Sequence, residues 1–406
     1  MSDHPESVDL TYGPEGDEGR RMLDPVGPIG LIALPGSVAF TDAVNQHIAE
    51  RRAKAVQSVA RHEAIQSGYL RRDYRIGADT RRFSTGEGRA IISQTVRGHD
   101  LFLLVDVMNH SCSYDMFGIC KTMTPDEHFQ DLKRVILAAS GKARRINVIM
   151  PYLYEGRQHK RNSRESLDCA YMLRELQALG VVNLITFDAH DPRVSNAIPL
   201  SGFENIQVAY QMLRSMMRSV PELCDNEHSL MVVSPDEGGM ARAMYFSSML
   251  SVPLGAFYKR RDYTRVIDGR NPIVAHEFLG SDVEGRDLLI VDDILSSGES
   301  LLSIAYDLHQ RKARNIYVAA SFALFTDGEE GIRKFDRAYA DGVITKLVST
   351  NLTYRQPELL AAPWYQDVDM TGFVALLIDT VNHDASLSSL IEPTGRIREM
   401  LDQLTG

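Results

Sequence analysis

The chain reads GRDLLIVDDILSSGES from Gly285 to Ser300. The apolar residues 288–291 have branched side chains and polar neighbours, which is typical of a strand buried on both faces of a parallel sheet. Two acids are expected to end this strand, and from Leu301 the apolar residues recur at helical spacing. A strand, a loop of small hydroxylated residues and a helix N-terminus present backbone N–H groups and a positive dipole end to an anion. The stretch therefore predicts a phosphate-binding loop.

The two acids, Asp292 and Asp293, need their own explanation, because a carboxylate beside a phosphate site is repelled unless something lies between them. Open α/β sheets bind ligands at the carboxyl ends of their strands. There the acids could bind the vicinal hydroxyls of a ribose, directly or through Mg²⁺, while Ser296, Ser297 and Ser300 hold its 5-phosphate. In the plainer interpretation the acids only cap the following helix. A cap needs one acid, so we favour the ribose site.

Length and composition set the broad class of the protein. The 406 residues, 44% of them apolar, are enough for about two to three domains. A net charge of −10 and a pI of 5.7 disfavour nucleic acid or an anionic membrane as the main partner. No apolar run reaches the ~20 residues that span a bilayer, and the polar, acidic N-terminus does not resemble a signal peptide. The four cysteines lack metal-ligand spacing. We expect a cytoplasmic protein with free thiols.

Strand and helix patterns alternate along most of the chain. Residues 1–26 show no apolar period and are expected to form a loosely attached arm, and the Arg-rich residues 60–82 are expected to be an inserted, solvated segment. Strands are expected at 29–34, 89–94, 101–105, 147–150, 183–187, 230–234, 254–257, 288–291 and 315–321. Helices are expected at 39–59, 129–139, 166–179 and 208–217, and from 239 and 301. This alternation predicts parallel, doubly wound sheets in two tandem α/β domains.

Polar clusters follow several of these predicted strands. They lie at Pro151 to His159, Phe187 to His190, Ser234 to Gly239 and Tyr258 to Arg261. Each has a plainer interpretation when taken alone. Runs such as Lys259-Arg260-Arg261 are usually solvated surface, and a histidine close to an aspartate can be a structural hydrogen-bonded pair. Their joint occurrence at strand ends, where such sheets bind ligands, favours function.

Taken in order with the Asp292 loop last, these clusters resemble those of the ribose-phosphate diphosphokinases, also called phosphoribosyl pyrophosphate synthetases. The resemblance extends from about Ile29 to the segment 382–388, and the extra length indicates a divergent member with an N-terminal extension and an insertion. It implies an α/β fold of two tandem phosphoribosyltransferase-like domains, each with a mainly parallel sheet flanked by helices. The expected parts are an arm (1–26), an ATP-side domain (27–202), a ribose-5-phosphate-side domain (203–380) and a C-terminal segment packing back on the first domain (381–406).

The resemblance also implies an activity, the transfer of pyrophosphate from MgATP to the anomeric hydroxyl of ribose 5-phosphate. It implies Mg²⁺ as cofactor and a homo-oligomer, because the family completes its active site between subunits. The residues matching the family's catalytic cations are Lys259 and Arg261. Those matching its ATP-binding residues are Phe83, Glu87, Arg157, Gln158 and His190. Those matching its ribose-5-phosphate site are Asp236, Asp292, Asp293, Ser296, Ser297, Gly298 and Ser300. The residues matching its metal contacts are His190 and Asp236.

Some positions depart from the family pattern. His159 and Ser296 stand where the family usually has aspartate, Tyr258 replaces an aspartate before Lys259, and Glu299 replaces a glycine in the phosphate loop. A carboxylate facing a phosphate dianion would weaken binding unless it points away or pairs with a cation. Two alternatives therefore stay open: a non-catalytic regulatory or associated subunit of the same family, and a phosphoribosyltransferase that consumes phosphoribosyl pyrophosphate.

Overall fold

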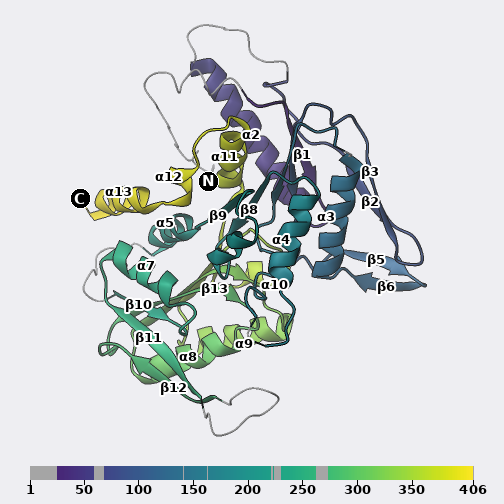
Figure 1. The fold of residues 1–406 in the computed structure, drawn as a ribbon. Helices are drawn as coiled ribbons and strands as arrows, with labels where there is room; N and C mark the ends of the chain where they lie inside the picture. The colour runs from purple at the N-terminus through teal and green to yellow at the C-terminus, as the bar shows by residue number, and fades with distance from the viewer. Residues whose placement is uncertain are drawn as a thin grey trace. The chain divides into compact units, whose positions relative to one another are not determined.

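The structure is a computed structural model that describes residues 25–58, 68–139, 141–161, 163–220, 223, 230–261 and 273–405. Within these ranges the side chains of 58, 259–261, 273–276 and 404–405 are outside the description. The chain divides into two compact units (Figure 1). Unit 1 comprises Met1–Thr186, Asp191–Asn205 and Met370–Ile391, and unit 2 comprises Phe187–His190, Ile206–Asp369 and Glu392–Gly406.

The domain boundaries expected from the sequence can be compared with the two compact units only in part. All but the last two residues of the predicted arm lie outside the described residues. The expected domain ranges remain a prediction. The compact units differ from them in joining Met370–Ile391 to unit 1 and Glu392–Gly406 to unit 2.

Unit 1 is built on a five-stranded sheet in the order β1-β4-β7-β8-β9. Its strands are β1 (Ile29–Ala33), β4 (Asp100–Leu104), β7 (Arg145–Ile149), β8 (Asn183–Phe187) and β9 (Gly202–Ile206). Neighbours from β1 to β8 pair in parallel, and every residue of β4 is buried. The helices are α2 (Val38–Ser58), α3 (Pro125–Ala139), α4 (Asp168–Ala178), η1 (Pro192–Ala197), α11 (Thr371–Asn382) and α12 (Ser388–Ile391). This confirms the predicted parallel α/β fold.

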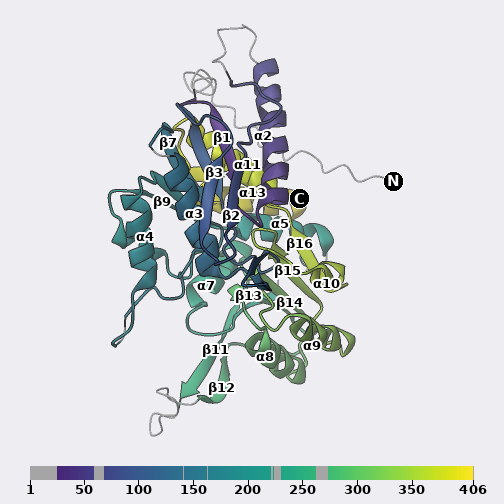
Figure 2. The same cartoon turned by 90° about the vertical axis from the view of Figure 1, so that its right-hand side faces the viewer.

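Helix α11 packs beside α2 although more than three hundred residues separate them in the sequence (Figure 2). Arg52 of α2 is fully buried between them. Its Nε donates to Asp379 Oδ1 at 2.8 Å and its Nη2 donates to Asn382 Oδ1 at 2.6 Å. Its guanidinium also lies 4.4 Å from the ring centroid of Tyr69. The C-terminal part of the chain thus completes the core of unit 1.

The described part of the Arg-rich segment, residues 68–82, is not the solvated insertion that the sequence predicts. Tyr69 and Tyr74 are each 1% exposed, and the N–H of Ile76 donates to the Leu31 carbonyl of β1 at 2.7 Å. The segment then forms β2 (Ala78–Arg82), which pairs antiparallel with β3 (Gly88–Ile92). The prediction was wrong because Tyr69, Tyr74 and Ile76 are spaced among the arginines and are buried in unit 1. Residues 60–67 lie outside the description.

A further two-stranded ribbon in unit 1 is formed by β5 (Ser113–Met116) and β6 (Ile119–Thr122), which pair antiparallel. The ribbon contacts the turn between β2 and β3, because the N–H of Phe117 donates to the Ser84 carbonyl at 2.9 Å. The sequence pattern did not predict these two short strands.

Unit 2 contains a seven-stranded sheet in the order β12-β11-β10-β13-β14-β15-β16. The strands are β10 (Leu230–Ser234), β11 (Leu254–Arg261), β12 (Ile273–Leu279), β13 (Asp287–Leu295), β14 (Asn315–Ala323), β15 (Lys346–Thr350) and β16 (Tyr365–Val368). All neighbours pair in parallel except β11 and β12. The helices are α5 (Ala209–Ser219), α7 (Met240–Leu250), α8 (Glu299–Gln310), α9 (Glu329–Ala340), α10 (Pro357–Ala361) and α13 (Thr394–Thr405).

The core of unit 2 fixes where the predicted phosphate loop lies. Leu288 and Ile290 of β13 pack with apolar residues of α8 and α9 in one buried cluster that includes Trp364. Strand β13 does not stop at the two acids, as the sequence suggested, because Ile294 and Leu295 still pair with β14. The loop therefore begins at Ser296, between the end of β13 and the N-terminus of α8. No helix in the described ranges is long and apolar enough to cross a membrane.

Candidate functional site

The acid pair of β13 forms the centre of a charged cluster in unit 2. Asp293 is 5% exposed, and its two carboxylate oxygens face different partners, a histidine and an arginine. His190 Nδ1 lies 2.8 Å from Oδ2, and Arg242 Nη1 lies 3.4 Å from Oδ1. Burial opposes ionisation of Asp293, but the His190 hydrogen bond and the Arg242 charge outweigh it and lower the pKa of this carboxyl. Asp293 is therefore held as a carboxylate.

Asp292 has the opposite electrostatic environment. Its Oδ1 accepts a hydrogen bond from the backbone N–H of Asp293 at 2.9 Å. Burial first, and then the negative charge of Asp293, raise the pKa of Asp292. A ligand that brings hydroxyl donors or a cation to this pair would relieve the repulsion between its members.

The segment after β8 delivers His190 to this cluster. Asp188, two residues earlier, has a left-handed backbone with φ of 37° and accepts a hydrogen bond from Ser321 Oγ of β14 at 2.5 Å. Burial raises the pKa of Asp188, and the nearby Arg242 opposes that effect. His190 Nδ1 pairs with Asp293, an acid more than a hundred residues further along the chain. Both His190 and Asp188 belong to unit 2 by their contacts.

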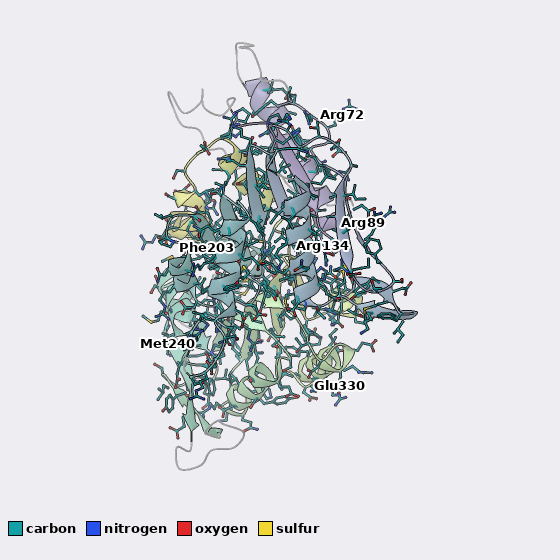
Figure 3. The ribbon with its side chains drawn as sticks, turned by 45° about the vertical axis from the view of Figure 1, so that its right-hand side comes forward. Arg72, Arg89, Arg134, Phe203, Met240 and Glu330 are labelled. Carbon is teal, nitrogen blue, oxygen red and sulfur yellow. The ribbon has the colours of Figure 1, made fainter. Side chains whose placement is uncertain are left out.

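Arg242 is the residue of this cluster that the sequence analysis missed. It lies on the first turn of α7, which starts at Met240 (Figure 3), and its side chain is 18% exposed. The available signal was its position one turn after a polar strand end, where a helix faces the carboxyl edge of the sheet. Helical spacing alone does not distinguish it from an ordinary surface arginine.

The predicted phosphate loop, Ser296 to Ser300, adopts a strained turn that requires glycine. Gly298 has φ of 82°, and a Cβ atom there would lie 2.5 Å from Phe335 Cε2. The loop is fastened to the neighbouring strand end, because the N–H of Thr326 donates to the Ser296 carbonyl at 3.0 Å. Ser297 Oγ lies 3.4 Å from the N–H of Glu299, which starts α8. The predicted residues Ser296, Ser297, Gly298 and Ser300 thus surround the N-terminus of α8.

Glu299, the extra acid of this loop, pairs with a cation. Lys334 Nζ of α9 donates to Glu299 Oε1 at 2.6 Å, and this hydrogen bond lowers the pKa of Glu299. Of the two conditions that the sequence analysis set for tolerating this acid, pairing with a cation is met.

Asp236 anchors the turn between β10 and α7. Its Oδ1 accepts the N–H groups of Gly238 and Gly239 at 2.9 and 3.1 Å, and Ser234 Oγ donates to its carbonyl at 2.7 Å. The neighbouring Glu237 is exposed. The predicted ribose-5-phosphate and metal role of Asp236 remains a prediction, and the turn gives its carboxylate a fixed orientation.

The predicted ATP residues of unit 1 lie on two separate loops. Phe83 and Glu87 close the β2–β3 turn, where the N–H of Phe83 donates to the Glu87 carbonyl at 2.7 Å. Phe83 is 52% exposed, although a lone phenylalanine would be expected in the core. Arg157 and Gln158 follow β7; Arg157 is exposed and Gln158 Nε2 donates to the Ser166 carbonyl at 2.9 Å. An exposed aromatic face and an exposed guanidinium suit a base and a phosphate.

The predicted catalytic cations lie at the end of β11. The strand is longer than predicted and includes both Lys259 and Arg261, with Lys259 opposite His276 of β12. The side chains of Lys259 and Arg261 lie outside the described residues, as do residues 262–272, which follow them. Their catalytic role stays a prediction.

The described side chains offer only part of the coordination that Mg²⁺ needs. They contain no group of three or more His, Cys, Asp or Glu residues that could hold a metal by themselves. Mg²⁺ usually takes only one or two protein carboxylates and fills its other positions with water and substrate phosphates. The Asp292–Asp293 pair and Asp236 supply oxygen donors of this kind, so the residues present fit a metal that arrives with a nucleotide.

Comparisons with known proteins identify the two domains of the chain. Residues 71–180 match the model of the N-terminal domain of ribose phosphate pyrophosphokinase, and residues 200–359 match the phosphoribosyl transferase domain. The chain belongs to the ribose-phosphate pyrophosphokinase family. The first match begins at residue 71, so part of the Arg-rich segment falls inside this family's N-terminal domain.

Relatives in the ribose-phosphate pyrophosphokinase family are distant but extend over most of the chain. The Ribose-phosphate pyrophosphokinase of Staphylococcus saprophyticus is 25% identical over 83% of this chain and 93% of the relative. That of Burkholderia pseudomallei is 27% identical over 76% of this chain and 87% of the relative. The crystal structure of phosphoribosylpyrophosphate synthetase from Mycobacterium smegmatis matches with a TM-score of 0.67 at 18% identity, covering 88% of this chain and all of that one. This last likeness supports the two-domain fold.

Proposed function

We propose that this chain is a Mg²⁺-dependent ribose-phosphate diphosphokinase that transfers the pyrophosphoryl group of ATP to ribose 5-phosphate. The observation that carries the proposal is an arrangement in unit 2 at the carboxyl end of β13. It combines an acid pair, the histidine and arginine that contact it, and a glycine-dependent anion loop. Sugar hydroxyls suit the acids, and a 5-phosphate suits the loop at the N-terminus of α8. The distant relatives with this activity in their names support the same substrates.

The described residues divide the proposed work between them. Ser296, Ser297, Gly298 and Ser300 hold the 5-phosphate, while Asp292 and Asp293 accept hydrogen bonds from ribose hydroxyls. Phe83 stacks on the adenine, Glu87 accepts from its amino group, and Arg157 and Gln158 contact the ATP phosphates. His190 is kept in one orientation by Asp293 and contacts a phosphate with its outer edge.

The proposed chemical step forms one bond and breaks one. The anomeric hydroxyl oxygen attacks the β-phosphorus, the bond from that phosphorus to the bridging oxygen of the α-phosphate breaks, and AMP leaves with this oxygen. The hydroxyl proton passes to water. Lys259 and Arg261 stabilise the negative charge that develops on the leaving oxygen, which is the main contribution a protein makes to phosphoryl transfer. His190 and Asp236 are the residues that would hold Mg²⁺, which would offset the phosphate charge when bound.

The experiment is to incubate the purified chain with MgATP and ribose 5-phosphate and to follow AMP and phosphoribosyl pyrophosphate by ³¹P NMR. We expect both products in equal amounts, and a loss of turnover by roughly a hundredfold or more in Lys259→Ala. Arg337→Ala, on the exposed side of α9, is the matched control that should keep the natural rate.

The other outcomes separate the alternatives. Bound MgATP with no turnover would support the non-catalytic subunit instead. Consumption of phosphoribosyl pyrophosphate with a purine or pyrimidine base would support a phosphoribosyltransferase. The proposal also includes a cytoplasmic homo-oligomer that binds neither nucleic acid nor membrane, and analytical ultracentrifugation of the active preparation tests the assembly.

A further inference from the structure

The ion pair between Glu299 and Lys334 lies at the N-terminus of α8. Glu299 is the first residue of α8, directly after Gly298, and Lys334 lies one turn into α9, whose N-terminal turn is marked by Glu330 in Figure 3. Lys334 Nζ is 2.6 Å from Glu299 Oε1 and 3.5 Å from Asp327 Oδ2. Lys334 therefore lies between the acid of the anion loop and an acid of the neighbouring loop after β14.

The Glu299 carboxylate and a bound phosphate would both be attracted to the N-terminus of α8. The N-terminus of a helix attracts negative charge, whether it is a bound phosphate or a carboxylate of the first turn. A glutamate at this position can turn its carboxylate toward the N–H groups of its own loop. An unpaired Glu299 would then repel, or replace, the phosphate that the loop is built to hold.

Lys334 is placed to prevent this. Its side chain extends from α9 to Glu299. Helix α9 is held against the loop because the next residue, Phe335, is fully buried and packs against Gly298. Asp327 contacts the same ammonium group and limits where Lys334 can lie. The neighbouring Arg333 instead pairs with Glu330 of its own helix at 3.3 Å.

We propose that Lys334 is a positioning residue for the anion loop, which keeps the Glu299 carboxylate on the α9 side and so sets the affinity for the 5-phosphate of the sugar substrate. The inference rests on the proposed function of the loop as the ribose-5-phosphate site. It assigns Lys334 no contact with the substrate.

The test is steady-state kinetics at low salt with ribose 5-phosphate and MgATP varied separately. Lys334→Ala should raise the KM for ribose 5-phosphate about three- to tenfold, because one uncompensated charge then faces a dianion at close range. The KM for MgATP and kcat should stay within about twofold, since only substrate binding changes. Lys334→Arg should keep the natural KM, and the double variant Lys334→Ala with Glu299→Ala should restore it.

Salt dependence distinguishes repulsion from a structural role. The KM effect of Lys334→Ala should shrink as ionic strength rises, because exposed charges are screened within a Debye length of about 10 Å at 0.1 M. Arg333→Ala is the matched control and should change neither KM. If Lys334→Ala does not fold, Lys334→Met keeps the aliphatic stem and removes only the charge. An unchanged KM in a folded variant, or a double variant as weak as Lys334→Ala alone, would overturn the inference.

If the natural protein shows no turnover, the proposed function is contradicted, and the role of Lys334 must then be tested by a binding measurement. Calorimetric titration with ribose 5-phosphate should then show the same loss in Lys334→Ala and the same recovery in the double variant. If the natural protein binds no ribose 5-phosphate at all, the inference is wrong as well.

Discussion

The Arg242 guanidinium lies 3.4 Å from Asp293 Oδ1, and His190 contacts the other oxygen of the same carboxylate. One buried acid therefore connects a helix of unit 2 to the histidine that follows β8. Asp293 therefore has a structural task besides any contact with a substrate, because moving it would also release His190. Any sugar that binds to the acid pair meets an acid already held by a histidine and an arginine.

Arg242→Gln should weaken both the site and the fold. Asp293 is almost fully buried, so removing Arg242 leaves its negative charge poorly compensated. The free energy of unfolding should therefore fall by about 2 kcal/mol. The value of kcat/KM for ribose 5-phosphate should fall about tenfold or more, because His190 loses its fixed partner. Met244→Ala, on the exposed side of the same helix, is the control. Unchanged kinetics in a folded Arg242→Gln variant would contradict the connecting role.

Asp292 predicts a pH dependence of stability. Its pKa is raised in the folded state, so the folded chain binds more protons than the unfolded chain once the pH exceeds about 4, the ordinary value of an aspartate. The favourable contribution is present at acid pH and is lost as the pH rises toward the folded pKa. Asp292→Asn should therefore gain in melting temperature, relative to the natural protein, between pH 5 and pH 8. Asp341→Asn, exposed at the end of α9, should show no such trend.

If the difference in melting temperature between Asp292→Asn and the natural protein is the same at pH 5 and at pH 8, ionisation of Asp292 does not cause the pH dependence. Binding of ribose 5-phosphate, measured by calorimetry, should be weakened more by this variant at pH 8 than at pH 5, since an amide accepts hydrogen bonds less strongly than a carboxylate and Asp292 is protonated at the lower pH.

Elements that depend on their own residues were predicted correctly from the sequence, whereas features that depend on contacts with other parts of the chain were not. Strand β10 has the predicted limits, 230–234, because a run buried on both faces carries its own signal. Residues 68–82 were misread because the burial of Tyr69 depends on Arg52 and on α11, which are remote in sequence. Arg242 and Lys334 were missed for a similar reason, since a cation on a helix has no local pattern that names its acid partner. The assigned substrate contacts remain predictions.

Gly298→Ala should disrupt the anion loop for two reasons that can be separated. The new Cβ would lie 2.5 Å from Phe335 Cε2, and φ of 82° disfavours any side chain. Gly285→Ala is the matched control, because Gly285 has φ of 71° but no atom within 4 Å of a new Cβ. We expect Gly285→Ala to cost about 1 kcal/mol and Gly298→Ala roughly 2–4 kcal/mol in chemical denaturation. Equal losses would mean that Phe335 moves away freely.

Arg52→Met should destabilise unit 1. The methionine fills much of the space between Tyr69 and α11, but Asp379 and Asn382 lose their buried hydrogen-bond partner. Breaking a buried pair in this way costs about 3 kcal/mol, whereas Arg51→Ala, whose side chain is 26% exposed and contacts the other oxygen of Asp379, should cost less than about 1 kcal/mol. The measurement is urea denaturation of the full chain, followed by hydrogen exchange of α2 and α11. Because α11 belongs to the core of unit 1, its amides should exchange together with those of α2 in the Arg52→Met variant. Protection of α2 with early exchange of α11 would mean that α11 is only loosely packed on unit 1.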